Sequence, residues 1–442
     1  MTQVRVRFVT DYDIYRVTDT PFAIPITLSS SGLNDVVNHL LGNDENDDNN
    51  VNFDFTINNV FIKDKLSKIL KSYNISLESA VTIKYFPTIN INNDKKINID
   101  TNAWVGSLDF NDNFLLTGCY DGNCQLFNIK KDKGKGDIQT IHNFTPHDVP
   151  IRAVKFLNNN NNNDNDYVCT GSKDHTVKIS NINTNQVIAT GTEHYNSVES
   201  LCTFHYNDDY LLFSGDWAGN VVCWNISNDL LIDVQQNNKH SSSSSKSRKR
   251  NRNNNDSSTT TATSSSLKKT FSMNCHTQCI SKLFTLNQNS LVTVSHDHFL
   301  KLWDIERQDN TSTIPCKKVI TDADYNKITN SILSTSHTDG VIRLWDLRLN
   351  NETFSLSTLQ NSSNSSSNSS WVSGVSWHPN DANKLASCDY DGMIKLWDIR
   401  STNETIDTIN AHAGSKALCI HTMNDAIISG GADCQVVISP FM

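Results

Sequence analysis

The sequence predicts an all-β propeller of seven blades, preceded by a small α+β domain of the ubiquitin-like (β-grasp) class. Two observations support this prediction. A strand pattern recurs seven times between residues 102 and 442, and the first 87 residues do not share it. A repeat of roughly 40 to 50 residues is typical of propellers, because each repeat forms one blade. We therefore expect a domain at 1–87, a linker at 88–101 and a propeller at 102–442.

Each repeat ends in a strand whose sequence varies little. The clearest copies are HDHFLKLWDI, TDGVIRLWDL, YDGMIKLWDI and YDGNCQLFNI, and the degenerate ones are KDHTVKISNI, WAGNVVCWNI and ADCQVVISPF. In every copy a turn residue lies six positions before an aromatic residue or Ser. The pattern resembles the WD-repeat signature, so the predicted fold is a WD40 propeller. The seven pairs are Asp121/Phe127, Asp174/Ser180, Ala218/Trp224, Asp297/Trp303, Asp339/Trp345, Asp391/Trp397 and Asp433/Ser439.

The recurring side chains are expected to hold each blade together. The Asp accepts backbone N–H bonds in the turn before the strand, and the Trp buries its ring while its N–H finds a partner. The WD-repeat resemblance implies that this partner belongs to a Ser/Thr–His–Asp network, whose His opens the repeat. Because these residues recur once per repeat, we interpret them as scaffold rather than as catalytic pairs. The expected histidines are His147, His194 and His412, with His276 as a further candidate, whereas the repeats beginning near Trp104, Lys317 and Trp371 lack one and should be less rigidly tied.

Composition argues against several classes of function. Asp and Glu number 47 and Lys and Arg 38, so the net charge of -9 gives no overall basic surface for nucleic acid. No run approaches the roughly 20 apolar residues that a membrane span requires. The N-terminal MTQVRVRFVT alternates like a strand and lacks the apolar core of a secretory signal. No P-loop, GxSxG or HExxH motif is present, so we expect no enzyme, no cofactor and no small-molecule substrate.

The eleven cysteines are scattered, which is usual in a reducing compartment. Cys275 and Cys279 flank His276, but no second pair follows at zinc spacing. Small buried side chains are therefore the expected interpretation, zinc is the alternative, and no metal site of its own is predicted.

Four Asn-, Ser- and Asp-rich tracts interrupt the pattern. They are too polar to form a core and are expected to be loops between strands. A disordered basic and Ser/Asn-rich insertion is expected at 237–270. Its basic cluster has two interpretations, a nuclear-import signal or RNA contact, or a solvated loop. The tracts are Gly42–Asn50, Asn158–Asp166, Asn237–Ser266 and Asn361–Ser370, and the cluster consists of Lys246, Arg248, Lys249, Arg250 and Arg252, with Lys268 and Lys269 further on.

The first 87 residues have the element order of a β-grasp domain. Alternating residues predict strands, and apolar residues at helical spacing predict two helices. The domain does not end in Gly-Gly, so it is not a conjugated ubiquitin. The predicted strands are Gln3–Thr10, Phe22–Leu28, Val51–Ile57, Val60–Ile62 and Val81–Tyr85, with a helix opening at Ser31 and ending at Gly42, a turn at Asn58-Asn59 and a short helix over Leu66–Tyr73.

Three stretches of this domain resemble the Notchless-type N-terminal domain of ribosome-assembly factors: VRVRFVTDYDIYRVTDTPFAIP, DVVNHLL and NISLESAVTIKYFP. Two families share that domain. Notchless itself has an eight-bladed propeller, whereas the WD-repeat subunit of the pescadillo (PeBoW) complex, the Ytm family, has seven blades and a basic insertion between the third and fourth. The sequence is similar to the second family in both respects. It departs from that family in its Asn/Ser insertions and in its weak second and seventh repeats.

The resemblance implies a non-enzymatic assembly factor for large-subunit (60S) precursors, needed for processing of 28S and 5.8S rRNA. Its location would be the nucleus, in the nucleolus and nucleoplasm. The propeller would dock onto the WD protein called block of proliferation, with pescadillo as the third member of the complex, on pre-60S particles. A membrane has no part in this function.

The resemblance also implies that the ubiquitin-like domain binds midasin, an AAA ATPase that removes the complex from the particle. A loop Glu of the domain would supply a carboxylate to Mg²⁺ held by midasin, and the matching residue in SLES is Glu78. Magnesium prefers oxygen ligands in octahedral geometry, so a carboxylate presented from outside is able to complete its shell. Judged without the resemblance, Glu78 is an ordinary solvated loop acid.

Two other functions stay open. WD propellers also serve as substrate adaptors of ubiquitin ligases, although no F-box or helical linker motif is visible between Pro87 and Trp104. Direct RNA binding rests on the basic cluster alone. The repeats do not indicate which face of the propeller meets a partner.

Overall fold

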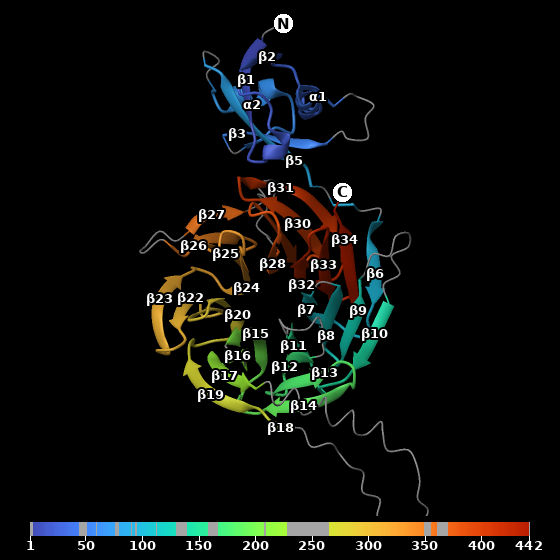
Figure 1. Ribbon diagram of the computed structural model, residues 1–442, viewed down its shortest axis with the longest axis vertical. Helices are drawn as coiled ribbons and strands as arrows, with labels where there is room; N and C mark the ends of the chain where they lie inside the picture. Colours follow the sequence, from blue (N-terminus) through green and yellow to red (C-terminus); the bar gives the residue numbers. More distant parts are fainter. Residues whose placement is uncertain are drawn as a thin grey trace, which may run out of the picture.

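The computed structural model describes residues 3–43, 51–58, 60–75, 79–89, 91–92, 95–111, 113–129, 139–157, 167–206, 209–227, 265–348, 355–359 and 370–441. A small α+β domain is followed by a ring of β-sheets, and the domain lies against one side of the ring, beside β31 (Figure 1). This architecture confirms the predicted fold class. None of the described helices is long and apolar enough to cross a membrane.

The N-terminal domain is a five-stranded mixed sheet in the order β2-β1-β5-β3-β4, the strand order of a β-grasp domain. The central pair β1 and β5 is parallel, and the flanking pairs are antiparallel. The inward residues of β1 alternate strictly with exposed ones, which is why this strand is predictable from its sequence. The elements are β1 (Gln3–Val9), η1 (Asp13–Tyr15), β2 (Phe22–Pro25), α1 (Ser30–Leu41), β3 (Phe53–Ile57), β4 (Val60–Phe61), α2 (Leu66–Ser72) and β5 (Val81–Pro87).

The ends of α1 follow ordinary capping rules. Ser29 accepts a hydrogen bond from the Gly32 amide, and Gly42 ends the helix with φ of 82°. Leu33 and Val37 face the domain core, together with Phe8, Phe55 and others. The expected strand Phe22–Leu28 is shorter than predicted, because β2 ends at Pro25 and the chain turns there, with the Leu28 amide bonded to the Pro25 carbonyl.

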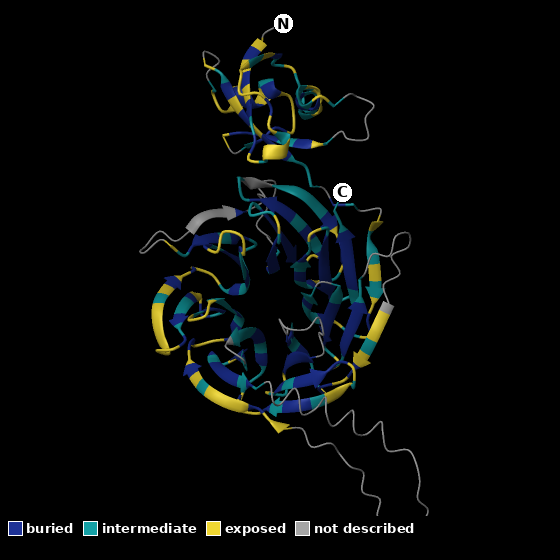
Figure 2. Ribbon diagram, in the orientation of Figure 1, coloured by how far each residue is buried: buried dark blue, intermediate teal, exposed yellow. Residues whose placement is uncertain are grey.

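The propeller consists of seven four-stranded antiparallel blades in the described residues, one with an added short strand. The first strands line the inside of the ring and the fourth strands the outside, where exposure is highest (Figure 2). The first strands are β7 (Val105–Asn111), β11 (Ile151–Phe156), β15 (Val198–Tyr206), β20 (Ile280–Asn287), β24 (Ile320–Tyr325), β28 (Val372–Trp377) and β32 (Ala417–Thr422). The second strands are β8 (Phe114–Cys119), β12 (Tyr167–Ser172), β16 (Asp209–Asp216), β21 (Ser290–Ser295), β25 (Ile332–His337), β29 (Lys384–Asp389) and β33 (Ala426–Gly431).

The third strands are those identified from the repeated sequence. They are β9 (Cys124–Asn128), β13 (Val177–Asn181), β17 (Asn220–Ile226), β22 (Phe299–Asp304), β26 (Ile342–Asp346), β30 (Met393–Asp398) and β34 (Gln435–Pro440). The fourth strands are β10 (Gln139–Phe144), β14 (Gln186–Gly191), β19 (Lys268–Asn274), β23 (Asp309–Pro315), β27 (Ser355–Leu359), β31 (Ser401–Asn410) and β6 (Ile97–Asp100), and β18 (Ser265–Ser266) adds to β14. Residues 265–270 were expected in the disordered insertion, but apart from Leu267 they lie in β18 and β19.

The ring is closed by a strand from before the first repeat. β6 lies in the stretch expected to link the two domains, yet it pairs with β34 and completes the seventh blade. This arrangement joins the two ends of the propeller and leaves no blade incomplete. The N-terminal domain is therefore connected to the ring through β6, the strand that follows β5 along the chain.

Candidate protein-docking surface

Four blades contain a buried hydrogen-bond network that begins at a His. In each, the His Nδ1 contacts an Asp carboxylate and the His Nε2 contacts a Ser or Thr hydroxyl. The rings of all four histidines are buried. The contacts are His147 with Asp174 (2.7 Å) and Thr170 (2.8 Å), His194 with Asp216 (3.1 Å) and Ser214 (2.6 Å), His276 with Asp297 (2.9 Å) and Thr293 (2.8 Å), and His412 with Asp433 (2.9 Å) and Ser429 (2.8 Å).

The expected Trp completes the network in two of these blades. Trp224 Nε1 donates to Ser214 at 2.8 Å, and Trp303 Nε1 donates to Thr293 at 2.9 Å. Burial raises the pKa of Asp297, but the hydrogen bond and charge of His276 and the hydrogen bonds from the Thr277 and Phe299 amides together outweigh burial, and the pKa falls to about 2. Hydrogen bonds from His147 and His194 likewise help to lower the pKa of Asp174 and of Asp216 against the effect of burial, so these three carboxylates stay ionised and fix the ring orientation of their His.

The third blade takes the acid of its network from a position that the sequence prediction did not name. Ala218 occupies the turn position, but the acid of the network is Asp216, two residues earlier. Its carboxylate is 1% exposed and also accepts hydrogen bonds from the Ala218 and Asn220 amides, at 3.0 and 2.8 Å. In the second and fourth blades these two positions are Ser172/Asp174 and Ser295/Asp297, so the third blade has moved its acid to the Ser position. The motif SGD before the turn was the available signal.

The fifth blade replaces the absent His with one from its own second strand. His337 is fully buried and its Nε2 contacts Thr335 Oγ1 at 2.8 Å, while Trp345 Nε1 donates to the same oxygen at 2.7 Å. Asp339 pairs with Arg343 at 2.6 Å rather than with a His. In the sixth blade Trp397 Nε1 donates to Ser387, and Asp389 pairs with Lys395. Other pairs thus occupy the site of the absent opening His in these two blades, and the expectation that they are less rigidly tied stays a prediction.

His337 predicts a loss of stability in mild acid. Burial, and after it the nearby Arg343, lowers the pKa of His337 from 6.5 to about 4. The unfolded chain therefore binds a proton at pH 5 that the folded chain does not, so stability falls as pH falls from 6.5 toward 4. The free energy of unfolding should drop between pH 7 and pH 5 in the wild type, and we expect this drop to be about 2 kcal/mol smaller in His337→Gln. Urea unfolding at the two pH values measures this.

The matched control is His298→Asn, because His298 is exposed, lies in the same propeller and has a φ of 72° that Asn also tolerates. The control should lose as much stability as the wild type. Equal pH dependence in His337→Gln and wild type would show that His337 is not the titrating group.

An aromatic surface lies at the end of the propeller where first strands begin and second strands end. We call Trp104, Tyr120, Trp217, Trp371 and Tyr390 the aromatic face. Four of them form two pairs held by backbone bonds, since the Tyr120 amide bonds to the Trp104 carbonyl at 2.9 Å and the Tyr390 amide to the Trp371 carbonyl at 3.0 Å. Trp104 and Tyr120 are 5.6 Å apart between ring centroids, and Trp371 stacks on Tyr390 at 5.6 Å.

The aromatic face is exposed to an unusual degree. Trp104, Trp217 and Trp371 are 48%, 52% and 48% exposed. Among the described residues nine large hydrophobic side chains are exposed, and five of them lie at this end of the ring: Trp104, Tyr195, Trp217, Phe299 and Trp371. Exposed Trp and Tyr gathered on one surface are typical of protein–protein contacts, because they bury much area with little loss of side-chain entropy.

Cations accompany these rings. The Arg152 guanidinium lies 5.3 Å from the Tyr120 centroid and donates to the Tyr120 hydroxyl, and Lys416 Nζ lies 4.6 Å above Tyr390. Arg152 Nε also donates to Glu199 at 2.7 Å, which ties the second blade to the third. The aromatic face therefore combines apolar area with oriented charge at the mouth of the central channel.

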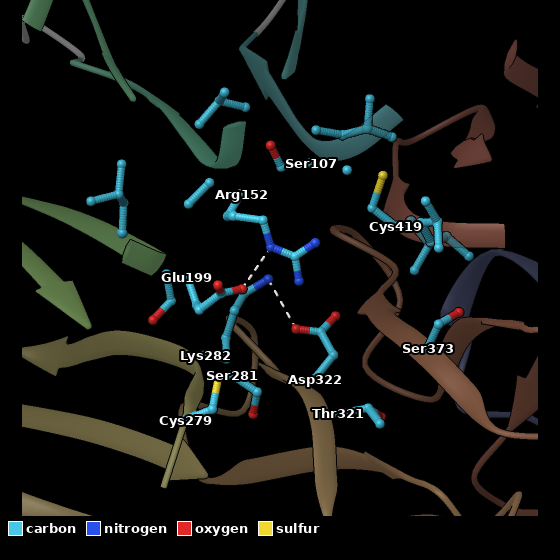
Figure 3. Close-up of a pocket in the computed structure, with 18 of the residues that line it drawn as sticks. Ser107, Arg152, Glu199, Cys279, Ser281, Lys282, Thr321, Asp322, Ser373 and Cys419 are labelled. Carbon is cyan, nitrogen blue, oxygen red and sulfur yellow. Dashed lines mark hydrogen bonds and ion pairs between the residues drawn. The ribbon is translucent and has the colours of Figure 1, made fainter. Parts of the chain in front are cut away.

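A cavity of about 180 Å³ opens at this mouth (Figure 3). Trp217 and His296 line it, together with the Arg152–Glu199 pair and the Lys282–Asp322 pair at 3.1 Å. Around it, first-strand side chains bond to the first strand of the next blade. These bonds are Ser200 to the Ile280 carbonyl (3.2 Å), Ser281 to Ile320 (2.9 Å), Thr321 to Val372 (2.5 Å), Ser373 to Ala417 (2.6 Å) and Cys419 to Val105 (3.5 Å).

The polar groups of the cavity serve to join blades. Its acids are in ion pairs, and burial raises the pKa of Cys279, which keeps this thiol protonated. Cys275 and Cys279 are both buried, burial raises the pKa of Cys275 to about 12, and the described residues contain no group of three potential metal ligands. The cavity is therefore part of the scaffold that carries the aromatic face.

Several residues singled out in the sequence lie outside the described part of the chain. They are Glu78 and the basic cluster Lys246, Arg248, Lys249, Arg250 and Arg252, with most of the four polar tracts. In the sequence, Glu78 falls after the end of α2 at Ser72 and before the start of β5 at Val81. Lys268 and Lys269 are described and lie in β19, where Lys269 pairs with Glu193. The aromatic face is the feature that the repeat pattern missed. Tyr120, Trp217 and Tyr390 each open one of the repeated copies, but their partners Trp104 and Trp371 lie outside the copies.

Comparison with known proteins agrees with this architecture. Residues 4–70 match the NLE (NUC135) domain, and five segments, 96–128, 138–180, 185–225, 267–304 and 357–398, match the WD domain, G-beta repeat. Proteins named ribosome biogenesis protein WDR12 homolog are similar over nearly their whole length. The protein of Nematostella vectensis is 27% identical over 443 residues, covering 99% of both chains. The chain is a homologue of the WDR12 ribosome biogenesis proteins.

Alignments with other WDR12 homologs also cover nearly the whole of both chains. That of Oryza sativa subsp. japonica is 27% identical over 447 residues, covering 99% of this chain and 96% of its own, and that of Dictyostelium discoideum is 29% identical over 465 residues, covering 99% and 95%. Because each alignment spans both domains, the order of an NLE domain and a WD propeller is shared. The family resemblance that the sequence suggested is thereby confirmed. The NLE match ends at residue 70 and so does not reach Glu78.

Proposed function

We propose that this protein is a non-enzymatic assembly factor for large (60S) ribosomal subunit precursors, needed for processing of 28S and 5.8S rRNA in the nucleolus and nucleoplasm. Similarity along the full chain to proteins named for ribosome biogenesis is the observation that carries the proposal. The aromatic face supports a docking role. We assign it as the surface that meets a protein partner.

The proposed partners are the block-of-proliferation WD protein and pescadillo, which bind through the propeller, and midasin, which binds through the N-terminal domain. Affinity purification of the full chain from its own cells, with mass spectrometry, tests this assignment. Recovery of these proteins with large-subunit precursors is the expected result. Recovery of a ubiquitin ligase scaffold in their place would favour the substrate-adaptor alternative and overturn the proposal.

Glu78 is proposed as the carboxylate that completes the shell of Mg²⁺ held by midasin. Because one acid supplies the ligand, Glu78→Ala should reduce midasin recovery at least about tenfold, while recovery of the propeller partners stays unchanged. Glu78→Asp is the conservative comparison, since it retains a carboxylate on a shorter side chain. A Glu78→Ala protein that leaves precursor particles as promptly as the wild type would contradict the release role.

The basic cluster at Lys246, Arg248, Lys249, Arg250 and Arg252 is proposed to serve nuclear import or contact with ribosomal RNA. Clustered basic residues suit both importins and phosphates. Lys269, which continues this basic region, is already paired with Glu193, so the proposal concerns the cluster alone.

A further inference from the structure

The N-terminal domain is connected directly to the strand that closes the propeller. β5 ends at Pro87, and β6 begins at Ile97 and pairs with β34. Tension on the N-terminal domain therefore passes along residues 88–96 to the first residue of β6. Figure 1 shows the domain and this connection on the same side of the ring as the C-terminal end of the chain.

The register makes this closure mechanically weak. Ile97 pairs with Ile438 and Asp100 with Gln435, so tension enters at Ile97 and leaves toward the C-terminus at the same end of the strand pair. Antiparallel strands that are loaded at the same end separate one hydrogen bond at a time. In the N-terminal domain, by contrast, parallel β1 and β5 are loaded at opposite ends and share the load among all their bonds. Left unsupported, β6 would separate from β34 before the N-terminal sheet gave way.

The connecting segment is anchored before it reaches β6. Ile91 is 4% exposed and packs in the core formed by the sixth and seventh blades, and it forms a bridge with Phe441. Its amide donates to Asp407 Oδ2 at 3.0 Å, and the Asn92 amide donates to the Pro440 carbonyl at 2.7 Å. Ile91 therefore resists removal by its buried side chain, independently of the β6 pairing.

A second set of contacts joins the N-terminal domain to the sixth blade. The Arg400 guanidinium lies 3.5 Å from the centroid of the Phe86 ring and pairs with the fully buried Asp398 at 2.6 Å. Lys384, which is 1% exposed, donates to the Pro87 carbonyl at 3.3 Å, and the Tyr12 hydroxyl donates to Asp381 at 3.0 Å. These contacts reach β29–β31 and the loop before them, so load entering there does not pass through β6.

We propose that Ile91 and the Arg400–Phe86 contact form a clamp that transfers tension from the N-terminal domain into the sixth blade and keeps β6 paired with β34. The clamp allows the domain to be pulled without opening the ring. Its purpose rests on the proposed release by an ATPase. Its mechanics belong to this chain alone and are measured without any partner.

The test is constant-force spectroscopy on the full chain, held at its two termini. Arg400→Ala should shorten the lifetime of the closed ring about tenfold, the change expected from losing one desolvated cation–π contact with its ion pair. The first extension step should then correspond to release of residues 88–101. In the wild type held at the same force, that step should come later.

Arg348→Ala is the matched control. Arg348 forms the corresponding Arg–Asp pair one blade earlier, with Asp346, but among the described residues it contacts no ring of the N-terminal domain. This variant should keep the wild-type lifetime. Lifetimes of Arg400→Ala that equal those of the wild type and Arg348→Ala would overturn the clamp, and so would equal shortening in both variants.

Ile91→Val, which trims one methylene, gives a second measurement and should shorten the lifetime less than Arg400→Ala. A chain that fails to bind ribosomal partners would leave these results unaffected, so failure of the clamp and of the proposed function are distinguishable.

Discussion

Asp216→Ala should lower the free energy of unfolding by about 3 kcal/mol, because it removes a buried ionised acid and leaves its partners without an acceptor. Asp216 is 1% exposed and accepts from His194 Nδ1 and from two backbone amides. His194 would lose the contact that orients its ring toward Ser214, and the Trp224 bond to the same oxygen would weaken. Chemical unfolding followed by tryptophan fluorescence measures the loss.

The chain offers a matched rescue for this change. The double variant Asp216→Ser with Ala218→Asp recreates the order found in the second and fourth blades, where Ser172 precedes Asp174 and Ser295 precedes Asp297. We expect it to recover the wild-type stability to within about 1 kcal/mol, since an acid from the turn reaches the His in those blades. A double variant no more stable than Asp216→Ala would show that the third blade depends on the position of its acid and not only on its presence.

Trp217→Ala should weaken binding of the propeller partner about 30-fold or more, equivalent to about 2 kcal/mol for an interface hot spot. Trp217 is 52% exposed, lies 5.9 Å from the His296 ring and contributes to the mouth of the channel. A protein that covers it would remove a large apolar area from water. The measurement is titration calorimetry with the partner recovered by affinity purification.

The control for this prediction lies at the opposite end of the ring. Ile328 is 49% exposed in the turn between β24 and β25, where first strands end rather than begin. Ile328→Ala should change the affinity by less than about twofold. A strong loss with Ile328→Ala and none with Trp217→Ala would move the docking surface to the other face.

Local pattern was sufficient for most of the fold. The alternation in β1, the helical spacing of Leu33 and Val37, and the seven copies ending at positions such as Trp303 and Trp397 each depend on neighbours within a few residues. The four opening histidines could also be found in the sequence, because each lies four or five residues before the first strand of its blade. The end of β2 could not be predicted, since the turn at Pro25 interrupts an apolar run that has the pattern of a single strand.

The candidate site was harder to predict because its contacts depend on which strands pair within each blade. Trp104 meets Tyr120, and Trp371 meets Tyr390, only when first and second strands are paired. His337 takes the place of an absent His from a different position in its repeat. Nothing in the spacing of these residues distinguishes them from other aromatic or polar residues near turns.

The sequence by itself determined that this protein has seven blades behind a β-grasp domain, because strand periodicity and the Asp-to-Trp spacing are local properties of the chain. Only the tertiary structure decided that Asp216 rather than the residue at 218 serves the third blade, that an aromatic face collects at one end of the ring, and that β6 closes the seventh blade. The physical reasons are strand pairing and ring closure. Strand pairing within a blade brings Asp216 to His194 and sets the aromatic pairs side by side, and ring closure brings β6 to β34, hundreds of residues away along the chain.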